Sequence, residues 1–265
     1  DRGIEPNLIT YNSVIKACAN GSKPDQALEI FREMKDKEIK PDLITYNSVI
    51  NACAKGNNLD QALKILEEMK DTEIKPNLIT YNSVINACAK GNNLNQALEI
   101  FQEMKDTEIK PDLITYNSVI SACAKGNNLD QALKILKEMK GEGIKPDLIT
   151  YNSVINACAK GNNLDQALKI LEEMKDTEIK PDLITYNSVI SACAKGNNLD
   201  QALKILKEMK GEGIKPDSNT NRLLRNLHIV ESPLPHNVPL PSNILDCRTI
   251  EVICEKSNSP VRLRL

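Results

Sequence analysis

Hydrophobic residues along this chain recur with the spacing of two short amphipathic helices. In the stretch that starts at residue 43, two successive sets of apolar side chains repeat at i, i+3, i+4 and i+7, which places each set on one helical face. The first set is Tyr46, Val49, Ile50 and Cys53, and the second is Leu59, Ala62, Leu63, Leu66 and Met69. The pattern predicts a pair of helices, each with one buried stripe.

Polar residues and breakers mark where these two helices begin and end. Thr45 is a plausible N-cap of the first helix, and Gly56 follows its last residue as a stop. Asn58 is placed to cap the second helix, with Gln61 three residues on completing a capping-box-like pair. Pro76 ends the hairpin, because proline cannot continue a helix.

The same pattern recurs six times with a period of 35 residues. The units are 8–42, 43–77, 78–112, 113–147, 148–182 and 183–217. Units 113–147 and 183–217 are identical, which points to recent duplication or consensus design. One hairpin cannot bury both of its stripes, so neighbouring hairpins must stack into a superhelix. The periodicity therefore predicts an all-α solenoid.

The ends of the chain depart from the repeat. Residues 1–7 are expected to be the end of a preceding repeat or an N-terminal cap, and residues 218–230 a degenerate capping helix. The tail at 231–265 contains prolines and a weakly alternating segment, so it could be a strand or disordered. We assign it no function.

Charge is distributed unevenly within each unit, although the net charge of the chain is only −2. None of the six first helices contains Asp or Glu, and Asn47, Asn51 and Lys55 form the polar face of one of them. If the first helices line the inside of the superhelix, they form a basic, amide-rich groove. Such a groove suits single-stranded nucleic acid, whose bases expose their hydrogen-bonding edges.

The sequence argues against several other chemistries. Six of the eight cysteines occur once per unit, which indicates buried small residues and neither disulfides nor a zinc site. A zinc deaminase would need His-x-Glu and Cys-x-x-Cys, which do not occur, and the carboxylates of the tail are scattered. No apolar run approaches the roughly 20 residues that cross a bilayer. We therefore expect no cofactor, no metal, no enzymatic activity and no membrane association.

The TYNSVI opening, the QALKILEEMK second helix and the IKPD close resemble a pentatricopeptide repeat protein of the P class, over residues 8–217. The related tetratricopeptide repeat has a 34-residue period with Trp and Leu-Gly near its start, which these units lack. The resemblance implies a right-handed superhelical α-solenoid of helix-turn-helix repeats. It also implies binding of single-stranded RNA at one base per repeat, acting by occupancy in RNA processing or stabilisation.

By this resemblance, the fifth residue of each unit reads the base together with the last residue of the unit. The pairs are Asn12 with Asp42, Asn47 with Asn77, Asn82 with Asp112, Asn117 with Asp147, Asn152 with Asp182, and Asn187 with Asp217. The family's code assigns uracil to Asn with Asp, and cytosine, with uracil tolerated, to Asn with Asn. The implied target is 5′-UCUUUU-3′, with C or U as its second base.

The resemblance gives two further sets of contacts. The second residue of each unit would clamp the base: Ile9, Ile44, Ile79, Ile114, Ile149 and Ile184. The last residue of most first helices would contact phosphate: Lys55, Lys90, Lys125, Lys160 and Lys195. The first unit has Asn20 at that position and Lys16 four residues earlier, so a weaker first phosphate contact is expected.

Each assignment has a purely structural alternative. The closing Asp could be a turn or capping residue, the Ile could pack at an interface, and the Lys could complement the helix dipole. The Asn could be solvated filler, although the sequence shows no structural use for a mediocre helix former at this position. As a whole, the groove could instead bind protein, as a helical-repeat scaffold.

Partners and location follow the same resemblance. The expected partner is pyrimidine-rich, U-rich single-stranded RNA, with RNA-processing proteins as further partners, and the chain is expected to be monomeric or associated end to end. The sequence starts at Asp1, so we expect a fragment or a processed form that would not show a targeting peptide. A natural chain is expected in the mitochondrion or chloroplast, and a designed one has no native location.

Overall fold

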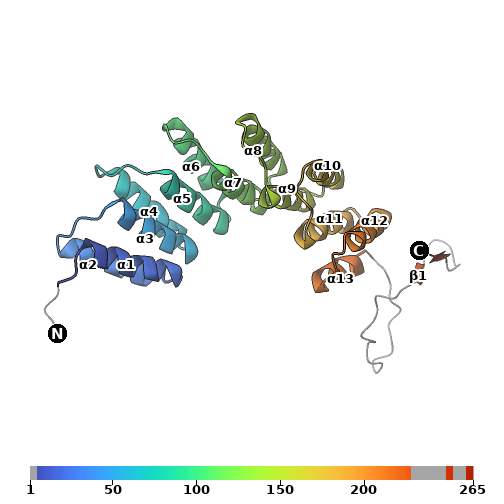
Figure 1. Ribbon diagram of the computed structural model, residues 1–265, viewed down its shortest axis with the longest axis horizontal. Helices are drawn as coiled ribbons and strands as arrows, with labels where there is room; N and C mark the ends of the chain where they lie inside the picture. Colours follow the sequence, from blue (N-terminus) through green and yellow to red (C-terminus); the bar gives the residue numbers. More distant parts are fainter. Residues whose placement is uncertain (1–4, 228–248, 253–260, 265) are drawn as a thin grey trace, which may run out of the picture. The chain divides into compact units, whose positions relative to one another are not determined.

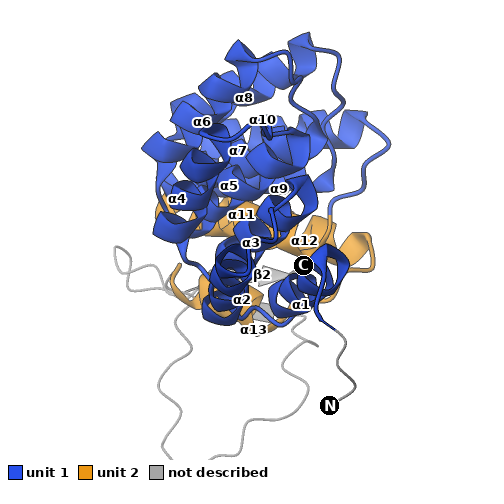
Figure 2. Cartoon of the chain, turned by 90° about the vertical axis from the view of Figure 1, so that its left-hand side faces the viewer, with its two compact units in different colours: residues 1–181 blue, residues 182–265 orange. Residues whose placement is uncertain are grey.

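The computed structural model describes residues 5–227, 249–252 and 261–264. Within these residues the chain consists of helical hairpins followed by one short helix and two short strands (Figure 1). It divides into two compact units, Asp1–Pro181 and Asp182–Leu265 (Figure 2). The first unit contains five hairpins, α1 to α10, and the second contains the hairpin of α11 and α12 together with α13, β1 and β2.

The first helix of every repeat has 13 residues and begins directly after the closing residue of the preceding repeat. These helices are α1 (Leu8–Asn20), α3 (Leu43–Lys55), α5 (Leu78–Lys90), α7 (Leu113–Lys125), α9 (Leu148–Lys160) and α11 (Leu183–Lys195). The predicted stripe of α3 is buried: Tyr46 is 2 % exposed, and Val49, Ile50 and Cys53 are fully buried. In α1, at the end of the stack, the equivalent Val14 is exposed. The stripe is buried because first helices stack on one another, α1 on α3, α3 on α5, α5 on α7 and α7 on α9.

The second helices follow after a short turn. They are α2 (Pro24–Asp36), α4 (Leu59–Lys70), α6 (Leu94–Asp106), α8 (Leu129–Gly141), α10 (Leu164–Asp176) and α12 (Leu199–Gly211). Of the predicted stripe in α4, Ala62, Leu66 and Met69 are fully buried, whereas Leu59 and Leu63 are only partly covered. Each second helix of unit 1 packs on the first helix of its own repeat, and α2, α4, α6 and α8 also contact the first helix of the next repeat.

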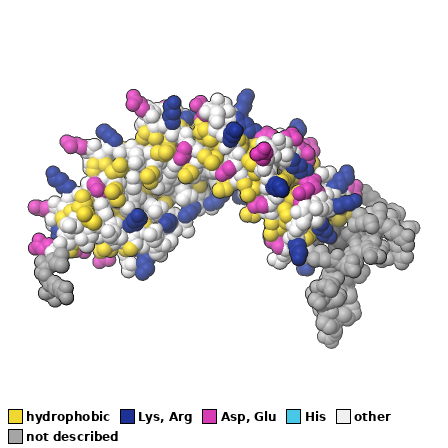
Figure 3. Space-filling model, in the orientation of Figure 1, with side chains coloured by type: hydrophobic (Ala, Val, Ile, Leu, Met, Phe, Trp, Pro, Cys, Tyr) yellow, Lys and Arg dark blue, Asp and Glu magenta, His cyan; other side chains and the backbone are white. Residues whose placement is uncertain are grey.

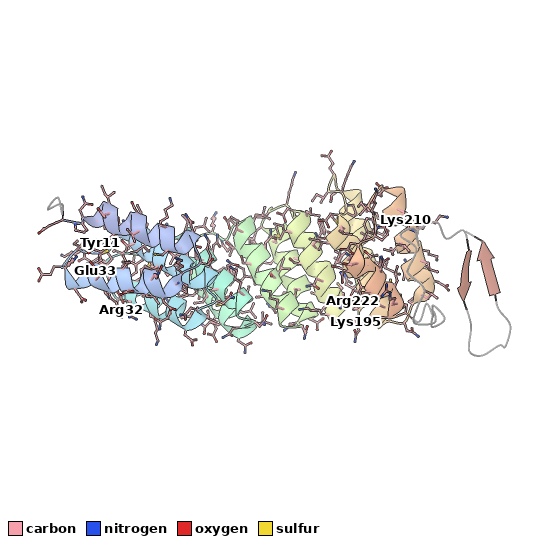
Figure 4. All side chains as sticks on the ribbon, turned by 90° about the horizontal axis from the view of Figure 1, so that it is seen from below. Tyr11, Arg32, Glu33, Lys195, Lys210 and Arg222 are labelled. Atoms are coloured by element: carbon pink, nitrogen blue, oxygen red, sulfur yellow. The ribbon has the colours of Figure 1, made fainter. Side chains whose placement is uncertain are left out.

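Contacts between hairpins combine aromatic packing with ion pairs. Phe31 on α2 meets Tyr46 on α3 edge to face, with ring centroids 5.5 Å apart. The hydroxyl of Tyr46 donates to Glu68 on α4 at 3.1 Å, and Lys35 of the preceding repeat pairs with the same carboxylate at 2.9 Å. The Tyr–Glu bond recurs in the first repeat, where Tyr11 and Glu33 lie 2.9 Å apart (Figure 4). Glu68 thus joins its own hairpin to the one before.

The helix caps correct one prediction and confirm another. Thr45 is not the N-cap of α3, because Asp42 occupies that place and Thr45 stands three residues further in. The Asp42 carboxylate accepts from the Thr45 N–H at 2.8 Å, and the Thr45 hydroxyl accepts from the Asp42 N–H at 3.1 Å, so the two form a capping box. Asn58 caps α4 as predicted, by accepting from the Gln61 N–H at 3.4 Å.

Gly56 ends α3 as predicted, although its φ of −82° is open to any residue. The left-handed residue of this turn is Asn57, with φ of 57°, a conformation that Asn tolerates better than most residues. Glycine is needed at position 56 for space, because a Cβ there would lie 2.3 Å from Cγ of Pro24 in the preceding hairpin. The turn of one repeat therefore packs closely against the second helix of the repeat before.

Beyond the sixth repeat, α13 (Ser218–Arg225) packs on α11 and is capped by Asp217 with Thr220. The strands β1 (Thr249–Val252) and β2 (Val261–Arg264) pair antiparallel, with Thr249 opposite Arg264. The other expectations for residues 228–265 lie outside the described residues. The predicted all-α solenoid of stacked hairpins is confirmed, with this short strand pair added at the C-terminal end of the sequence.

Candidate nucleic-acid interface

The first helices themselves carry no acidic side chains. Their sequences contain no Asp or Glu, and five of them end in a lysine. In unit 1, Figure 3 shows Lys and Arg side chains along both the upper and the lower edge, with many of the acidic side chains on the upper and outer parts. The acid-free first helices with their terminal lysines supply positive charge that a polyanion requires.

The fifth and last residues of a repeat contact each other directly, although they lie 30 positions apart. Nδ2 of each Asn donates to Oδ1 of its partner. The distances are 3.1 Å for Asn12–Asp42, Asn82–Asp112 and Asn117–Asp147, and 3.3 Å for Asn47–Asn77 and Asn187–Asp217. The remaining pair, Asn152 and Asp182, is divided between the two units. Five of the six pairs that the resemblance implied are thus brought together.

A threonine that the sequence analysis did not assign to the site joins each of these pairs. The Thr115 hydroxyl donates to Oδ1 of Asn82 at 2.6 Å and also lies 2.9 Å from Oδ1 of Asp112. The expectation that the Asn has no structural use is therefore wrong, because Asn82 links its helix to the cap of the next one. The spacing Asp112-x-x-Thr115 is a capping signature that could have revealed the threonine.

The closing aspartates are held as carboxylates. Burial raises the pKa of the Asp112 carboxyl, but hydrogen bonds from the Thr115 N–H, the Thr115 hydroxyl and Asn82 outweigh burial and leave the pKa below its usual value. The pKa values of Asp42, Asp147 and Asp217 are lowered in the same way. At neutral pH these groups can only accept hydrogen bonds.

Asn77 replaces this carboxylate in the second repeat and keeps the cap. Its Oδ1 accepts from the Thr80 N–H at 3.1 Å and from Nδ2 of Asn47 at 3.3 Å. Because only oxygen can accept these bonds, the cap determines which side of the amide is oxygen. Nδ2 of Asn77 then stands where the other repeats have the second carboxylate oxygen, so a donor replaces an acceptor.

The isoleucines at the second position are exposed. Ile44, Ile79, Ile114, Ile149 and Ile184 are 59–61 % exposed, and Ile9 is 73 % exposed. Ile9 and Ile44 line one pocket of about 260 Å³ together with Asn12 and Asp42. Packing between repeats does not account for an isoleucine at these positions, because more than half of each side chain is exposed. The pocket instead brings both expected clamps of the first base together with its expected reading pair.

The expected phosphate ligands lie at the C-terminal ends of the first helices. Lys55 and Lys90 are exposed; Nζ of Lys55 lies 3.5 Å from Oδ1 of Asn20, and Nζ of Lys90 lies 3.4 Å from the carbonyl of Ala54. Their position also complements the helix dipole, so both roles given to them are compatible. Lys16 of the first repeat lines the pocket between Ile9 and Ile44.

The tyrosines of the first helices and five of their cysteines are buried structural residues. Tyr46 and its equivalents lie in the core, and burial raises the pKa of the Cys53 and Cys193 thiols to about 11 and of the Cys88 thiol to about 12. In the described part of the chain no group of His, Cys, Asp and Glu is arranged to hold a metal ion. None of the helices described there has the length and apolarity to span a bilayer.

Comparison with known families agrees with this geometry. A family model described as the pentacotripeptide-repeat region of PRORP matches residues 78–228, which is more than half of the chain. The chain belongs to the pentatricopeptide repeat family. A second family model, the pentatricopeptide repeat domain, matches residues 1–56 and 36–93 of this pentatricopeptide repeat protein.

Solved structures give the same fold. The maize pentatricopeptide repeat protein PPR10 is 29 % identical, with a TM-score of 0.62 over 84 % of this chain and 32 % of PPR10. PPR10 in complex with an 18-nt psaJ RNA element is 28 % identical, with a TM-score of 0.56 over 86 % of this chain and 38 % of PPR10.

A third structure, the PPR domain of Arabidopsis thaliana PRORP1 in complex with tRNA, is 18 % identical, with a TM-score of 0.59 over 67 % of this chain and 94 % of that domain. This chain spans about a third of the length of PPR10. No curated protein matches the chain.

Proposed function

We propose that this pentatricopeptide repeat protein binds single-stranded RNA sequence-specifically, at one base per repeat, and acts by occupancy in RNA processing or stabilisation. The observation that carries the proposal is the pocket lined by Ile9, Ile44, Asn12 and Asp42. An aliphatic side chain from each of two repeats can cover the faces of a base there, while the amide and carboxylate meet its edge. Clamping by isoleucine would replace the aromatic platforms that other single-strand binders use.

The hydrogen bonds within each pair support uracil as the base read by Asn with Asp. One of the two N–H groups on Nδ2 of Asn82 donates to Asp112, and the other N–H takes no part in this bond. The hydrogen bonds from Asn82 and Thr115 to Asp112 all go to Oδ1, so Oδ2 accepts none of them. The pair therefore offers a donor beside an acceptor. Uracil presents the complement, a carbonyl oxygen beside the N3–H.

The second repeat supports cytosine by the same argument. Because the cap turns Nδ2 of Asn77 outward, the pair Asn47 and Asn77 offers two donors. Cytosine presents two neighbouring acceptors, O2 and N3. Rotation of one amide would still accommodate uracil, which agrees with the tolerance given by the family's code.

The proposed target is 5′-UCUUUU-3′, with C or U as its second base, bound parallel to the protein chain. The fifth uracil rests on the repeat sequence alone, since its pair is divided between the two units. Phosphates are assigned to Lys55, Lys90, Lys125, Lys160 and Lys195. The likeness to PPR10, whose structure was solved with an 18-nt psaJ RNA element, supports RNA as the ligand.

The test is the affinity of the purified chain for labelled RNA hexamers, measured by fluorescence anisotropy at moderate salt. We expect 5′-UCUUUU-3′ to bind at least about tenfold more tightly than a purine-rich hexamer, since several base-edge bonds are lost together. We expect 5′-UUUUCU-3′, which has the same composition in reversed order, to bind more weakly because it sets cytosine against an Asn–Asp pair. Equal affinity for all three hexamers would contradict base reading and favour a protein-binding scaffold.

A further inference from the structure

The third residue of the second to sixth repeats, and its equivalent on α13, is a buried threonine, although almost every other buried side chain in the described part of the chain is apolar. Thr45, Thr80, Thr115, Thr150, Thr185 and Thr220 are fully buried. A buried hydroxyl is costly unless it is hydrogen bonded. The Thr115 hydroxyl accepts from the Asp112 N–H at 3.1 Å and faces two acceptors, Oδ1 of Asn82 and Oδ1 of Asp112.

One hydroxyl proton cannot serve both acceptors fully. The contact to Asn82 is shorter, at 2.6 Å against 2.9 Å. Oδ1 of Asp112 also already accepts from the Thr115 N–H at 2.9 Å and from Nδ2 of Asn82 at 3.1 Å. The Thr115 hydroxyl therefore donates its proton mainly to Oδ1 of Asn82. This bond determines that the amide oxygen of Asn82 faces Thr115 while its amide nitrogen faces Asp112.

The same short bond recurs along the chain with one distance. Each threonine hydroxyl lies 2.6 Å from Oδ1 of the Asn 33 positions earlier: Thr45 to Asn12, Thr80 to Asn47, Thr115 to Asn82, Thr150 to Asn117, and Thr220 to Asn187. Thr45, Thr80, Thr115 and Thr150 lie in the repeat after the one whose Asn they contact, and Thr220 lies on α13, which follows the sixth repeat. Each reading group thus consists of three side chains from two consecutive repeats.

We propose that Thr115 is a positioning residue that sets base specificity for the repeat before its own, and this inference rests on the proposed function. By holding the Asn82 oxygen, Thr115 keeps the free N–H of Asn82 beside Oδ2 of Asp112, in the order that uracil needs. Without the hydroxyl, Asn82 keeps only its bond to Asp112 and can rotate about it. The third base of the target then loses its distinction between uracil and cytosine.

Thr10 provides a control within the chain itself. Its hydroxyl takes part in the same kind of helix cap, but among the described residues no base-reading Asn accepts from it. The Thr10 hydroxyl accepts from the Asn7 N–H at 3.4 Å and lies 3.1 Å from Oδ1 of Asn7, and Thr10 is exposed. Thr10→Val therefore removes a capping hydroxyl and leaves all six reading pairs intact.

The experiment measures the ratio of Kd values for hexamers with uracil or cytosine at the third base, and separately at the fourth. Thr115→Val should reduce the ratio at the third base by about three- to tenfold, the effect of one hydrogen bond. It should leave the ratio at the fourth base, read by Asn117 and Asp147, unchanged. Thr115→Ser should retain the wild-type ratios, and so should Thr10→Val.

The outcomes separate the two proposals. If the wild-type chain does not distinguish uracil from cytosine at either base, the proposed function fails. If the wild-type chain distinguishes them and Thr115→Val does so equally well, the positioning role is wrong. An equal loss at the third and fourth bases, or a loss in Thr115→Ser, would show a general structural effect and would also overturn the inference.

Discussion

Nδ2 of Asn82 donates a 3.1 Å hydrogen bond to Oδ1 of Asp112, 30 positions later in the chain. Asn82 lies on α5 and Asp112 caps α7, so the bond joins the first helices of two consecutive repeats. Both side chains are therefore held in place within the solenoid itself. A base that binds to this pair has little side-chain entropy to remove, which favours affinity and selectivity together.

The second repeat allows a direct test of base reading. Asn77→Asp restores the acceptor that the other repeats present, so preference at the second base should move from cytosine toward uracil by about tenfold, because a carboxylate accepts strongly from uracil N3–H. The measurement is the ratio of Kd values for 5′-UCUUUU-3′ and 5′-UUUUUU-3′. An unchanged ratio would show that the register or the reading pair is wrong.

The lowered pKa values of the capping aspartates predict loss of stability in acid. The pKa of Asp112 is below its ordinary value of 3.8 in the folded chain, so near that pH the unfolded chain binds more protons and falling pH favours unfolding. The contribution is complete above the unfolded pKa and is lost as pH falls through the folded one. Thermal melts at pH 3 and pH 6 should show a smaller difference in Tm when Asp42, Asp112 and Asp147 are all replaced by Asn.

Asn77 makes this triple variant a fair comparison, since an Asn already caps α5 in the native chain. The replacement keeps the capping oxygen and removes only the titrating group. If the triple variant loses as much Tm in acid as the native chain, the acid sensitivity comes from other carboxylates, such as Glu33, whose bonds to Lys37 and Tyr11 also lower its pKa.

Local patterns in the sequence were sufficient to predict the hairpins. The stripe containing Tyr46 and Ile50 is buried as its spacing indicated, because helical periodicity depends only on neighbours along the chain. The cap was harder to predict. Thr45 and Asp42 are both good N-cap residues. In the structure Asp42 is the N-cap, because its carboxylate accepts from the Thr45 N–H, and Thr45 is buried in the core.

The contacts that form the candidate site depend on how the hairpins stack, which no local pattern contains. The bond from Thr115 to Asn82 spans 33 positions, so the sequence alone showed no structural use for Asn82. Gly56 is a similar case: it was predicted as a helix stop, but its need for space against Pro24 depends on the preceding hairpin. The reading pairs themselves came from family resemblance and not from periodicity.

The exposed isoleucines should contribute to RNA affinity without contributing to stability. Ile114 is 60 % exposed, so Ile114→Ala should change the free energy of unfolding by less than about 0.5 kcal/mol. Its burial against a base should be worth about 1.5 kcal/mol, so affinity for 5′-UCUUUU-3′ should fall about tenfold. The control is Ile120→Ala on the same helix, where the side chain is fully buried and the loss of stability should be about 2–5 kcal/mol. An Ile114→Ala chain that binds RNA as tightly as the native chain would contradict the clamping role.

The glycines that follow the first helices should differ from one repeat to another in how well they tolerate a methyl group, although their local backbone is nearly the same. A Cβ at Gly56 would lie 2.3 Å from Cγ of Pro24, whose ring cannot move aside as a flexible side chain would, so Gly56→Ala should cost about 1–3 kcal/mol of stability. At Gly161 the nearest side-chain atom is Cβ of Leu129 at 3.5 Å, which is ordinary contact, and φ is −79°. Gly161→Ala should therefore be neutral or stabilise by up to about 1 kcal/mol, since alanine reduces the freedom of the unfolded chain. Urea denaturation followed by circular dichroism compares the two variants. Equal losses would show that glycine is required by the turn itself and not by the approach of the preceding hairpin.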